Sequence, residues 1–279
     1  MTPTEKTPVP RTGRYWLVLV AALLMAGACA TVSGASTTAW PAANSPARSP
    51  LLWSGDVSTG DLSQFVVEPA NNVGGTTPTV VTNPTHHGRY AIALTLNGAT
   101  DPGEGICCGS RNELLPHFRD LREGDDLWFG FSTYLGDGFP TSGGWQSITQ
   151  FKQNQDGAPP LSLNVEDGQY KIEGGYGHPG GPKVFIRPVG EAVTGRWEDW
   201  VWHVRFSTDS SVGFVEVWLG GRPVLHRFAP PGGTLYPGTG PKAGSYVKTG
   251  PYRERTISKP GTLYLADWRI ATNADAMRP

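Results

Sequence analysis

Between residues 51 and 270 the chain contains short segments in which apolar and polar residues alternate or apolar residues follow one another. Alternation with a period of two is typical of strands, because successive side chains of a strand point to opposite faces. Clusters of Gly, Pro, Asp and Asn separate the segments, and only residues 111–121 suggest a short helical turn, which Pro116 interrupts. The pattern predicts an all-β domain of the sandwich or jelly-roll class. The expected strands cover residues 51–53, 90–96, 127–135, 147–152, 161–165, 200–206, 213–219 and 262–270.

The segment 200–206 illustrates how the two faces of an expected strand differ. Trp200 and Trp202 fall on one side with the other apolar residues, whereas His203 and Arg205 fall on the opposite side. A strand of a two-sheet sandwich packs one face in the core and presents the other to solvent. We therefore expect the tryptophans to be buried, and His203 and Arg205 to line a surface that could bind a sugar chain.

The first 30 residues are typical of a secretory signal peptide. Basic residues precede an apolar run over 15–28 that is too short to cross a bilayer, and small residues follow it. Residues 26–29 resemble a lipoprotein box, which would place a lipid on Cys29; ordinary cleavage between 28 and 35 is the alternative. Either cleavage predicts export, with the protein secreted or lipid-anchored on the outer face of the cell membrane. No transmembrane span is expected in the mature protein.

Three parts are expected after the signal peptide. Residues 31–50 are rich in Ser, Ala, Thr and Pro without periodicity, which is typical of a flexible linker. Residues 51–272 are enough to bury the core of one β domain, and residues 273–279 are expected to be a tail. No internal repeat or second domain is evident, and we expect the protein to be a monomer.

The composition limits the partners of the protein. A net charge of −1 gives no general attraction for nucleic acid or for an anionic membrane, and 10 Trp suit a carbohydrate-facing surface. Cys107 and Cys108 are adjacent, which excludes a disulfide framework, and two thiols are too few for a structural zinc site. No metal-binding side chains are therefore predicted, while a structural Ca²⁺ held by backbone carbonyls stays open.

Three segments carry polar residues suited to acid–base chemistry, at 110–114, 150–152 and 246–253. If they are strands, the period of two directs Leu114 and Phe151 into the core and places one set of polar side chains on a common face. Because these side chains come from separate strands, we expect them to converge on one surface. The set consists of Arg111, Glu113, Gln150, Lys152, Tyr246, Lys248 and Tyr252.

Arg-Asn-Glu-Leu at 111–114, Gln-Phe-Lys at 150–152 and Tyr-Val-Lys-Thr-Gly-Pro-Tyr at 246–252 resemble the three motifs of the alginate lyases of polysaccharide lyase family seven. The layout of residues 51–270 resembles the heparin-lyase-like and glucuronan lyase group of β-jelly-roll lyases, through the segments 53–63, 87–91, 195–205 and 215–221. The resemblance implies a β-jelly roll, that is, a concanavalin-like two-sheet sandwich with a concave substrate groove. It also implies a secreted polysaccharide lyase that cleaves a uronic-acid-containing polysaccharide by β-elimination.

The resemblance implies a role for each matching residue. Arg111 and Gln150 would neutralise the uronate carboxylate, since donors placed where charge develops are worth about 3 kcal/mol each. Tyr252 would protonate the departing O4, either as the acid alone or as both acid and base. Lys248 would favour the phenolate of Tyr252 and bind the anionic substrate. No cofactor is required for this chemistry.

The sequence departs from the alginate lyase motif at Lys152, where the motif has a histidine. A lysine with an ordinary pKa of about 10.4 is a poor base at neutral pH. The base is then expected to be His86, His87 or Tyr252, and His87 is preferred to His86 because it adjoins Gly88 at the start of a predicted strand. Residues expected to contact the substrate are Glu113, Lys152, His86, His203, Arg205, Arg253 and Tyr246.

Two other classes of function use the same fold. A glycoside hydrolase needs two suitably spaced carboxylates, whereas Glu166 with Asp167 and Glu198 with Asp199 are adjacent pairs that point to opposite faces. A non-catalytic carbohydrate-binding sandwich would need the tryptophans but not the set of polar residues around Tyr252. The sequence therefore favours a lyase acting on an acidic polysaccharide of the glucuronan, alginate or glycosaminoglycan type.

Overall fold

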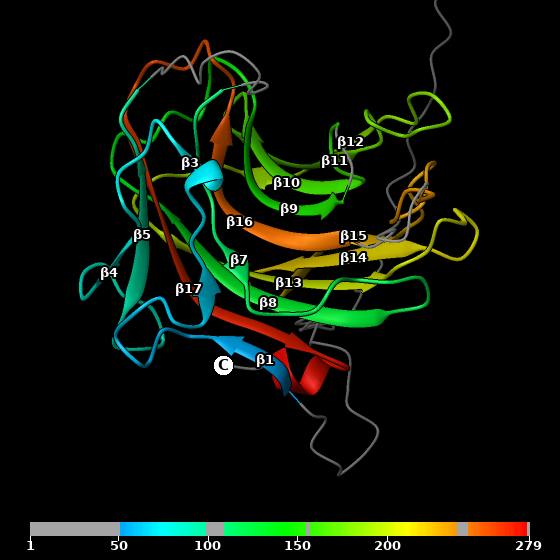
Figure 1. Cartoon of the computed structure of the whole chain (residues 1–279), viewed down its shortest axis with the longest axis horizontal. Coiled ribbons are helices and arrows are strands. Elements are labelled where there is room, and N and C mark those ends of the chain that lie inside the picture. Colours follow the sequence, from blue (N-terminus) through cyan, green and yellow to red (C-terminus); the bar gives the residue numbers. More distant parts are fainter. Residues whose placement is uncertain (1–50, 99–108, 155–156, 239–244, 278–279) are drawn as a thin grey trace, which may run out of the picture. The chain divides into compact units, whose positions relative to one another are not determined.

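Antiparallel strands form two large sheets, as the alternating pattern predicts (Figure 1). The computed structural model describes residues 51–98, 109–154, 157–238 and 245–277. The expected signal peptide, the expected linker and all three cysteines lie outside these residues. Among the residues described, no helix is long and apolar enough to cross a membrane.

The first sheet has eight strands. Seven of them pair in the order β15-β14-β13-β8-β17-β5-β4, and β1 also pairs with β17. The strands are β1 (Leu51–Gly55), β4 (Thr79–Val81), β5 (Ala91–Leu96), β8 (Asp126–Leu135), β13 (Trp197–Arg205), β14 (Phe214–Leu219), β15 (Arg222–Phe228) and β17 (Gly261–Ala271).

The second sheet has seven strands in the order β12-β11-β10-β9-β16-β6-β3. They are β3 (Asn72–Val73), β6 (Arg111–Asn112), β9 (Gln146–Gln153), β10 (Leu161–Glu166), β11 (Gln169–Gly174), β12 (Phe185–Glu191) and β16 (Ser245–Arg253). A small ladder joins β2 (Phe65–Val66) to β7 (Leu115–Pro116), and two 3₁₀ turns, η1 (Pro69–Asn71) and η2 (Ala274–Met277), complete the described elements.

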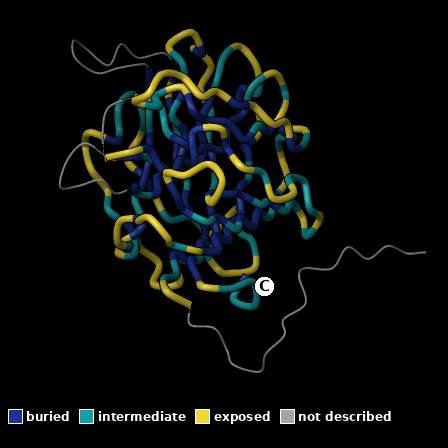
Figure 2. Tube along the Cα trace, turned by 90° about the vertical axis from the view of Figure 1, so that its right-hand side faces the viewer, coloured by how far each residue is buried: buried dark blue, intermediate teal, exposed yellow. Residues whose placement is uncertain are grey.

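Apolar side chains from the facing sides of the two sheets form the core (Figure 2). Trp200 and Trp202 of β13 are almost completely buried, as the period of two predicts. Phe151 of β9 is fully buried, and its ring centroid lies 5.6 Å from that of Trp202, so it links the two sheets. Because successive strand residues face opposite ways, burial of Phe151 turns Gln150 and Lys152 to the outer face of the seven-stranded sheet.

The seven-stranded sheet is hollowed on its outer side. In Figure 1, β9, β10 and β16 curve so that their concave side faces away from β8 and β13. The arrangement is a β-jelly roll with a concave sheet, which confirms the fold class expected from the sequence.

Two segments differ from the expectations. Residues 111–121 form no helical turn: they contain β6 and β7, and Pro116 lies in β7, which pairs with β2 in a two-stranded ladder. Proline lacks an N–H, so an edge position in a short ladder suits it. In the expected tail, Met277 of η2 is buried against Trp128 and Val201 on the outer face of the eight-stranded sheet.

Candidate active site

Strands β6, β9 and β16 bring the three polar segments together on the concave sheet. Lys248 lies opposite Gln150 in the β16–β9 ladder, and Tyr252 lies opposite Arg111 in the β16–β6 pair. The β16–β9 register shifts after Thr249, where three residues of β16 span two residues of β9. This bulge allows Tyr252 to reach Arg111 while Lys248 stays beside Gln150.

The carboxylate of Glu113 lies at the centre of this group. Gln150 Nε2 donates a 2.6 Å hydrogen bond to one of its oxygens, and Lys248 Nζ donates to the other at 3.4 Å. Lys248 Nζ also donates to Asn71 Oδ1 at 2.6 Å. Because Glu113, Gln150 and Lys248 are all buried, the network fixes their side chains in the floor of the sheet.

Burial raises the pKa of Glu113, and the charges of Lys248 and Arg111 act in the opposite direction. Hydrogen bonds from an amide and an ammonium group offset the free-energy cost of burying this carboxyl group. Glu113 therefore positions Gln150 and Lys248, rather than contacting substrate itself as the sequence suggested.

Arg111 and Tyr252 form the second part of the group. The guanidinium carbon of Arg111 lies 4.3 Å from the centroid of the Tyr252 ring, and Trp145 packs edge-on against the same ring at 5.0 Å. Burial raises the pKa of Tyr252, while Arg111 acts to lower it. The cation beside this phenol is therefore Arg111, whereas the sequence assigned that role to Lys248, whose ammonium group is bonded to Asn71 and Glu113.

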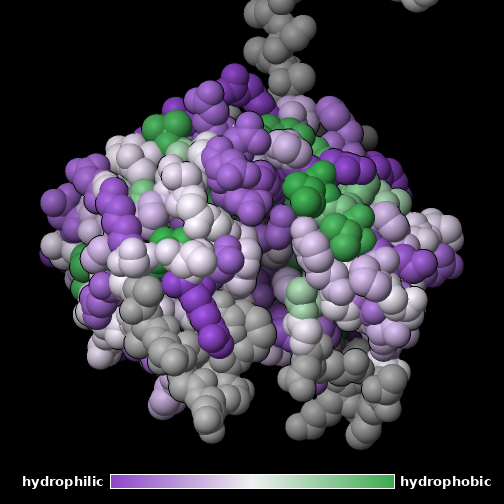
Figure 3. All heavy atoms as spheres, turned by 90° about the horizontal axis from the view of Figure 1, so that it is seen from above, coloured by the Kyte–Doolittle hydropathy of each residue, from purple (hydrophilic) through white to green (hydrophobic). Residues whose placement is uncertain are grey.

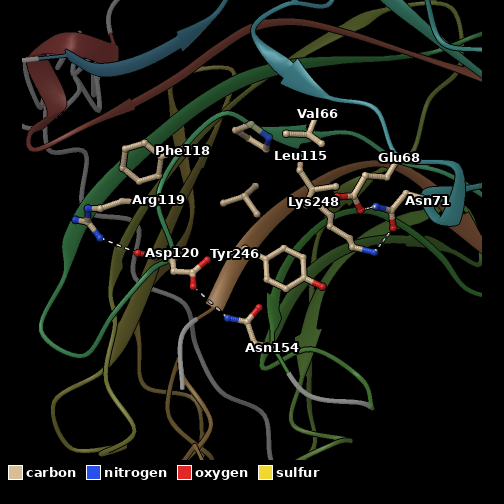
Figure 4. A pocket seen from close by; sticks show the side chains of 12 residues that line it. Val66, Glu68, Asn71, Leu115, Phe118, Arg119, Asp120, Asn154, Tyr246 and Lys248 are labelled. Carbon is tan, nitrogen blue, oxygen red and sulfur yellow. Dashed lines mark hydrogen bonds between the residues drawn. The ribbon is translucent and has the colours of Figure 1, made fainter. Parts of the chain in front are cut away.

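A recess adjoins this group on the side of Lys248 and Tyr246. It encloses about 380 Å³, and both side chains line it together with Glu68 and Asn71 (Figure 4). Seen from above, the surface of the molecule is mostly hydrophilic and is hollowed near its centre (Figure 3). Tyr246 thus borders a space next to the polar group, as expected of a residue that contacts a sugar.

Lys152 and Arg253 have different positions. Lys152 lies on the same face as Gln150, and its Nζ donates to the Gln153 carbonyl at 3.2 Å. Arg253 is only 1% exposed and donates to the Lys259 carbonyl at 2.7 Å. The expectation that Arg253 contacts substrate is wrong, because its place directly after Tyr252 turns it to the opposite face of β16.

The four other predicted residues lie on the eight-stranded sheet. His203 and Arg205 are on the outer face of β13, where His203 contacts Glu216 and Asp126 at 2.7 and 2.6 Å. His86 and His87 precede β5 and interact with Asp199 of β13. The period of two placed His203 and Arg205 on the correct face of their strand, but it could not tell which sheet that strand joins.

The expectation that His87 or His86 supplies the base beside Tyr252 is therefore wrong. The core of the sandwich separates the outer face of the eight-stranded sheet from the concave face of the other sheet. Among the predicted acid–base residues, Tyr252 is the one that this structure places with Arg111 and Gln150.

Sequence reasoning missed a polar row that continues across the concave sheet. Ser147 Oγ donates to Asn164 at 2.8 Å, and Asn164 Nδ2 donates to Glu173 of β11. Ser162 pairs with both Gln150 and Glu173 in register, which puts Glu173 two strands from Gln150. The alternation of Leu161-Ser-Leu-Asn-Val165 contained the signal for Ser162 and Asn164.

A family model described as "Polysaccharide lyase" matches residues 57–269. The chain belongs to the polysaccharide lyase family. The match covers nearly all of the jelly roll, including every residue of the group around Glu113. The enzyme class that the motifs implied is thereby confirmed.

Solved structures share the fold of this lyase at low sequence identity. Cellulose induced protein Cip1 is 18% identical, with a TM-score of 0.52 over 79% of this chain and 97% of that chain. Alginate lyase A1-II′, a member of polysaccharide lyase family 7, is 15% identical, with a TM-score of 0.51 over 70% and 84%. The binding domain of Paraclostridial Mosquitocidal Protein 1 is 10% identical, with a TM-score of 0.52 over 81% and 51%. No curated protein sequence matches the chain.

Gly250 provides a test of how the bulge in β16 supports the site. Its φ is +127°, and a Cβ atom there would overlap the carbonyl oxygen of Asn112 and lie 2.9 Å from Glu113 Cα. We expect Gly250→Ala to lower the free energy of unfolding by about 2–4 kcal/mol and to reduce lyase activity, because β6 must move away. Gly124→Ala is the control, since Gly124 also has a positive φ (+86°) but no described atom within 4 Å of the added Cβ. If urea unfolding showed the same loss of stability in Gly250→Ala and Gly124→Ala, this role of the bulge would be contradicted.

The raised pKa of Glu173 leads us to expect that the stability of the fold depends on pH. Burial, assisted by Glu166, raises the pKa of Glu173 to about 7. A carboxyl group whose pKa is higher in the folded state favours folding when protonated, so its contribution falls as pH rises from about 5 to 8. We expect urea unfolding of Glu173→Gln to show a smaller loss of stability over this range than wild type. Identical pH profiles would show that Glu173 titrates as it does in the unfolded chain.

Proposed function

We propose that this lyase cleaves a 4-linked uronate polysaccharide by β-elimination on the concave sheet, with Arg111, Gln150 and Tyr252 around the reacting sugar. The observation that supports the proposal is the position of Tyr252 beside Arg111, on the same strand (β16) as Lys248 of the Gln150–Glu113–Lys248 network. A cation, an amide donor and a phenol are the groups that the elimination requires.

The reaction begins at C5 of the uronate, whose proton is only weakly acidic. The Arg111 guanidinium and the Gln150 amide stabilise the negative charge that develops on the adjacent carboxylate when this proton leaves. The C5–H electrons then form the C4–C5 double bond, and the C4–O4 bond breaks. O4 takes a proton and leaves with the fragment that gains a new reducing end. The other fragment begins with a 4,5-unsaturated sugar at its new non-reducing end.

Tyr252 is proposed to carry out both proton transfers. Its raised pKa keeps the phenol protonated in the free enzyme, which suits the acid that protonates O4. To act first as the base, the phenol must lose its proton to solvent as the substrate binds, and the adjacent Arg111 cation favours the phenolate. The phenolate then takes the C5 proton and passes it to O4, which regenerates the phenolate. The buried network of Glu113 keeps Gln150 in place throughout these steps.

The sequence supports export of this enzyme to where such polymers occur. Residues 1–30 have the features of a signal peptide, and Cys29 would allow lipid attachment. We propose that the mature enzyme acts outside the cell as a monomer. Retention of the full-length chain in the cytoplasmic fraction of an expressing cell would contradict this localisation.

Tyr252→Phe tests the proposed acid–base role. The substitution removes only the hydroxyl, so we expect turnover to fall by about 10²–10⁴-fold while the affinity for the polymer is retained. The readout is the ultraviolet absorbance of the unsaturated uronate product, with calorimetry to measure binding. Tyr264→Phe, on the eight-stranded sheet, is the matched control and should keep full activity. Full turnover by Tyr252→Phe would assign the proton transfers to another group.

A single acid–base residue also predicts which polymers react. In β-D-glucuronate and β-D-mannuronate units the C5 proton and O4 lie on the same side of the ring, whereas in α-L-guluronate and α-L-iduronate units they lie on opposite sides. Because one phenol serves one side of the sugar, we expect turnover of glucuronan or polymannuronate and not of polyguluronate. A panel of these polymers, assayed by the same absorbance, would contradict the single-tyrosine mechanism if polyguluronate were the preferred substrate.

A further inference from the structure

A second polar cluster lies on the outer face of the eight-stranded sheet, away from the proposed active site. His86 Nε2 is 2.7 Å from Asp199 Oδ1, and His87 Nε2 is 3.6 Å from Asp199 Oδ2. One ligand-type atom from each of the three residues lies within 4.8 Å of the other two. The lyase chemistry proposed above does not use this cluster.

The local backbone explains how two consecutive histidines reach one carboxylate. Neighbouring residues of an extended strand point to opposite sides, but His87 has a φ of +53°. This left-handed conformation turns its side chain to the side of His86, and the two imidazole centroids lie 3.8 Å apart. A non-glycine residue in this conformation is uncommon, and such residues often occur at functional sites.

Neighbouring groups orient the cluster. Ser132 Oγ donates a 2.6 Å hydrogen bond to Asp199, and the ring of His86 stacks on Trp197 with centroids 5.0 Å apart. Contacts that fix the rotamers of ligand side chains are typical of metal sites. These contacts leave the cluster accessible, since the side chains of His87 and Asp199 are 39% and 43% exposed.

A second anionic group lies beside the histidines. Asp267 of β17 interacts electrostatically with Arg269 and, less strongly, with His87 and His86, and it shares a cavity of about 200 Å³ with His87 and Asp199. Its Oδ2 atom is buried and has no hydrogen-bond partner within the described part of the chain. A β-bulge after Ala266 directs Asp267 to this outer face while Trp268 stays in the core. A buried carboxylate oxygen without a donor leaves room for a bound ion or water, although Arg269 lines the same cavity.

We propose that His86, His87 and Asp199 bind a divalent transition-metal ion of the Zn²⁺ type, with Asp267 contributing negative charge next to it. Two imidazoles and one carboxylate form a donor set that suits Zn²⁺, and the fourth position is open to water. Donor atoms of a tetrahedral zinc site with bonds of about 2.0–2.1 Å lie about 3.3 Å apart. Asp199 Oδ1 lies 2.7 Å from His86 Nε2 and the other oxygen, Oδ2, lies 3.6 Å from His87 Nε2, so small rotations of these side chains would bring three donors to this spacing.

The charge of the cluster also favours a cation. Two neutral imidazoles contribute no charge, the carboxylates of Asp199 and Asp267 contribute two negative charges, and Arg269, which lines the same cavity, offsets one of them. His203 provides a contrast, because both of its ring nitrogens already contact carboxylates, of Glu216 and Asp126. The bound ion would fasten the segment before β5 to β13, independently of catalysis. It revises the expectation that the chain has no metal-binding side chains.

Calorimetric titration with ZnCl₂ tests the proposal on the metal-free protein, carrying no histidine tag and with its thiols alkylated so that cysteines do not bind the metal. We expect saturable binding of one Zn²⁺ per chain, an increase in Tm on binding, and no comparable effect of Ca²⁺, which prefers oxygen ligands. His87→Gln should weaken Zn²⁺ binding by at least about tenfold. His226→Gln, which replaces an exposed histidine of β15, should bind as wild type does.

Asp199→Asn provides a second variant in case His87→Gln alters the fold, and circular dichroism of the metal-free variants verifies folding. Weakened Zn²⁺ binding in this folded variant would support the proposal. The proposal would be overturned if wild type showed no saturable Zn²⁺ binding, if both variants bound as tightly as wild type, or if Ca²⁺ bound in preference to Zn²⁺. Because the readouts are binding and Tm, these outcomes do not depend on the proposed lyase mechanism.

Discussion

The buried carboxylate of Glu113 is the interaction on which the proposed active site depends. It accepts from Gln150 of β9 and Lys248 of β16, and it follows Arg111 of β6 by two residues, so it connects the three strands that carry the motifs. A buried carboxylate is costly unless it is paired, and removing one partner of such a pair costs about 3–5 kcal/mol. The strands are therefore constrained to the register that holds Gln150 in the proposed active site. The glutamate of the Arg-x-Glu motif therefore has a structural role, which is to connect these strands through its hydrogen bonds.

The alternation of side chains was sufficient to predict a sandwich or jelly roll and the direction of several polar side chains on the concave sheet. Burial of Phe151 follows from its place in an alternating segment, and it fixes the outward direction of Gln150 and Lys152. The grouping of Lys248 with Tyr252 was also predicted from their spacing. Local spacing could not predict the partners of Glu113, because Asn71, Gln150 and Lys248 come from distant parts of the chain and meet only when the sheet forms.

The residues that the sequence placed wrongly were misplaced because strand order and local backbone conformation cannot be predicted from alternation. His203 was assigned correctly to an outer face, but the order of strands places β13 in the eight-stranded sheet. His87 was preferred as a base for its place before a strand, whereas its left-handed backbone directs it to Asp199. Arg253 was grouped with Tyr252 although its neighbouring position turns it inward. Strand pairing and bulges therefore decide which polar residues meet, and the two polar surfaces of this lyase serve different ligands in our account.

A crystal structure of the Tyr252→Phe variant with a bound glucuronan or polymannuronate oligosaccharide would test the central claim most directly. We predict one sugar carboxylate within hydrogen-bonding distance of both Arg111 and Gln150, with C5 and O4 of that sugar facing residue 252 and the neighbouring units lying along the concave sheet. An oligosaccharide bound on the outer face of the eight-stranded sheet, near His87 or His203, would contradict the account.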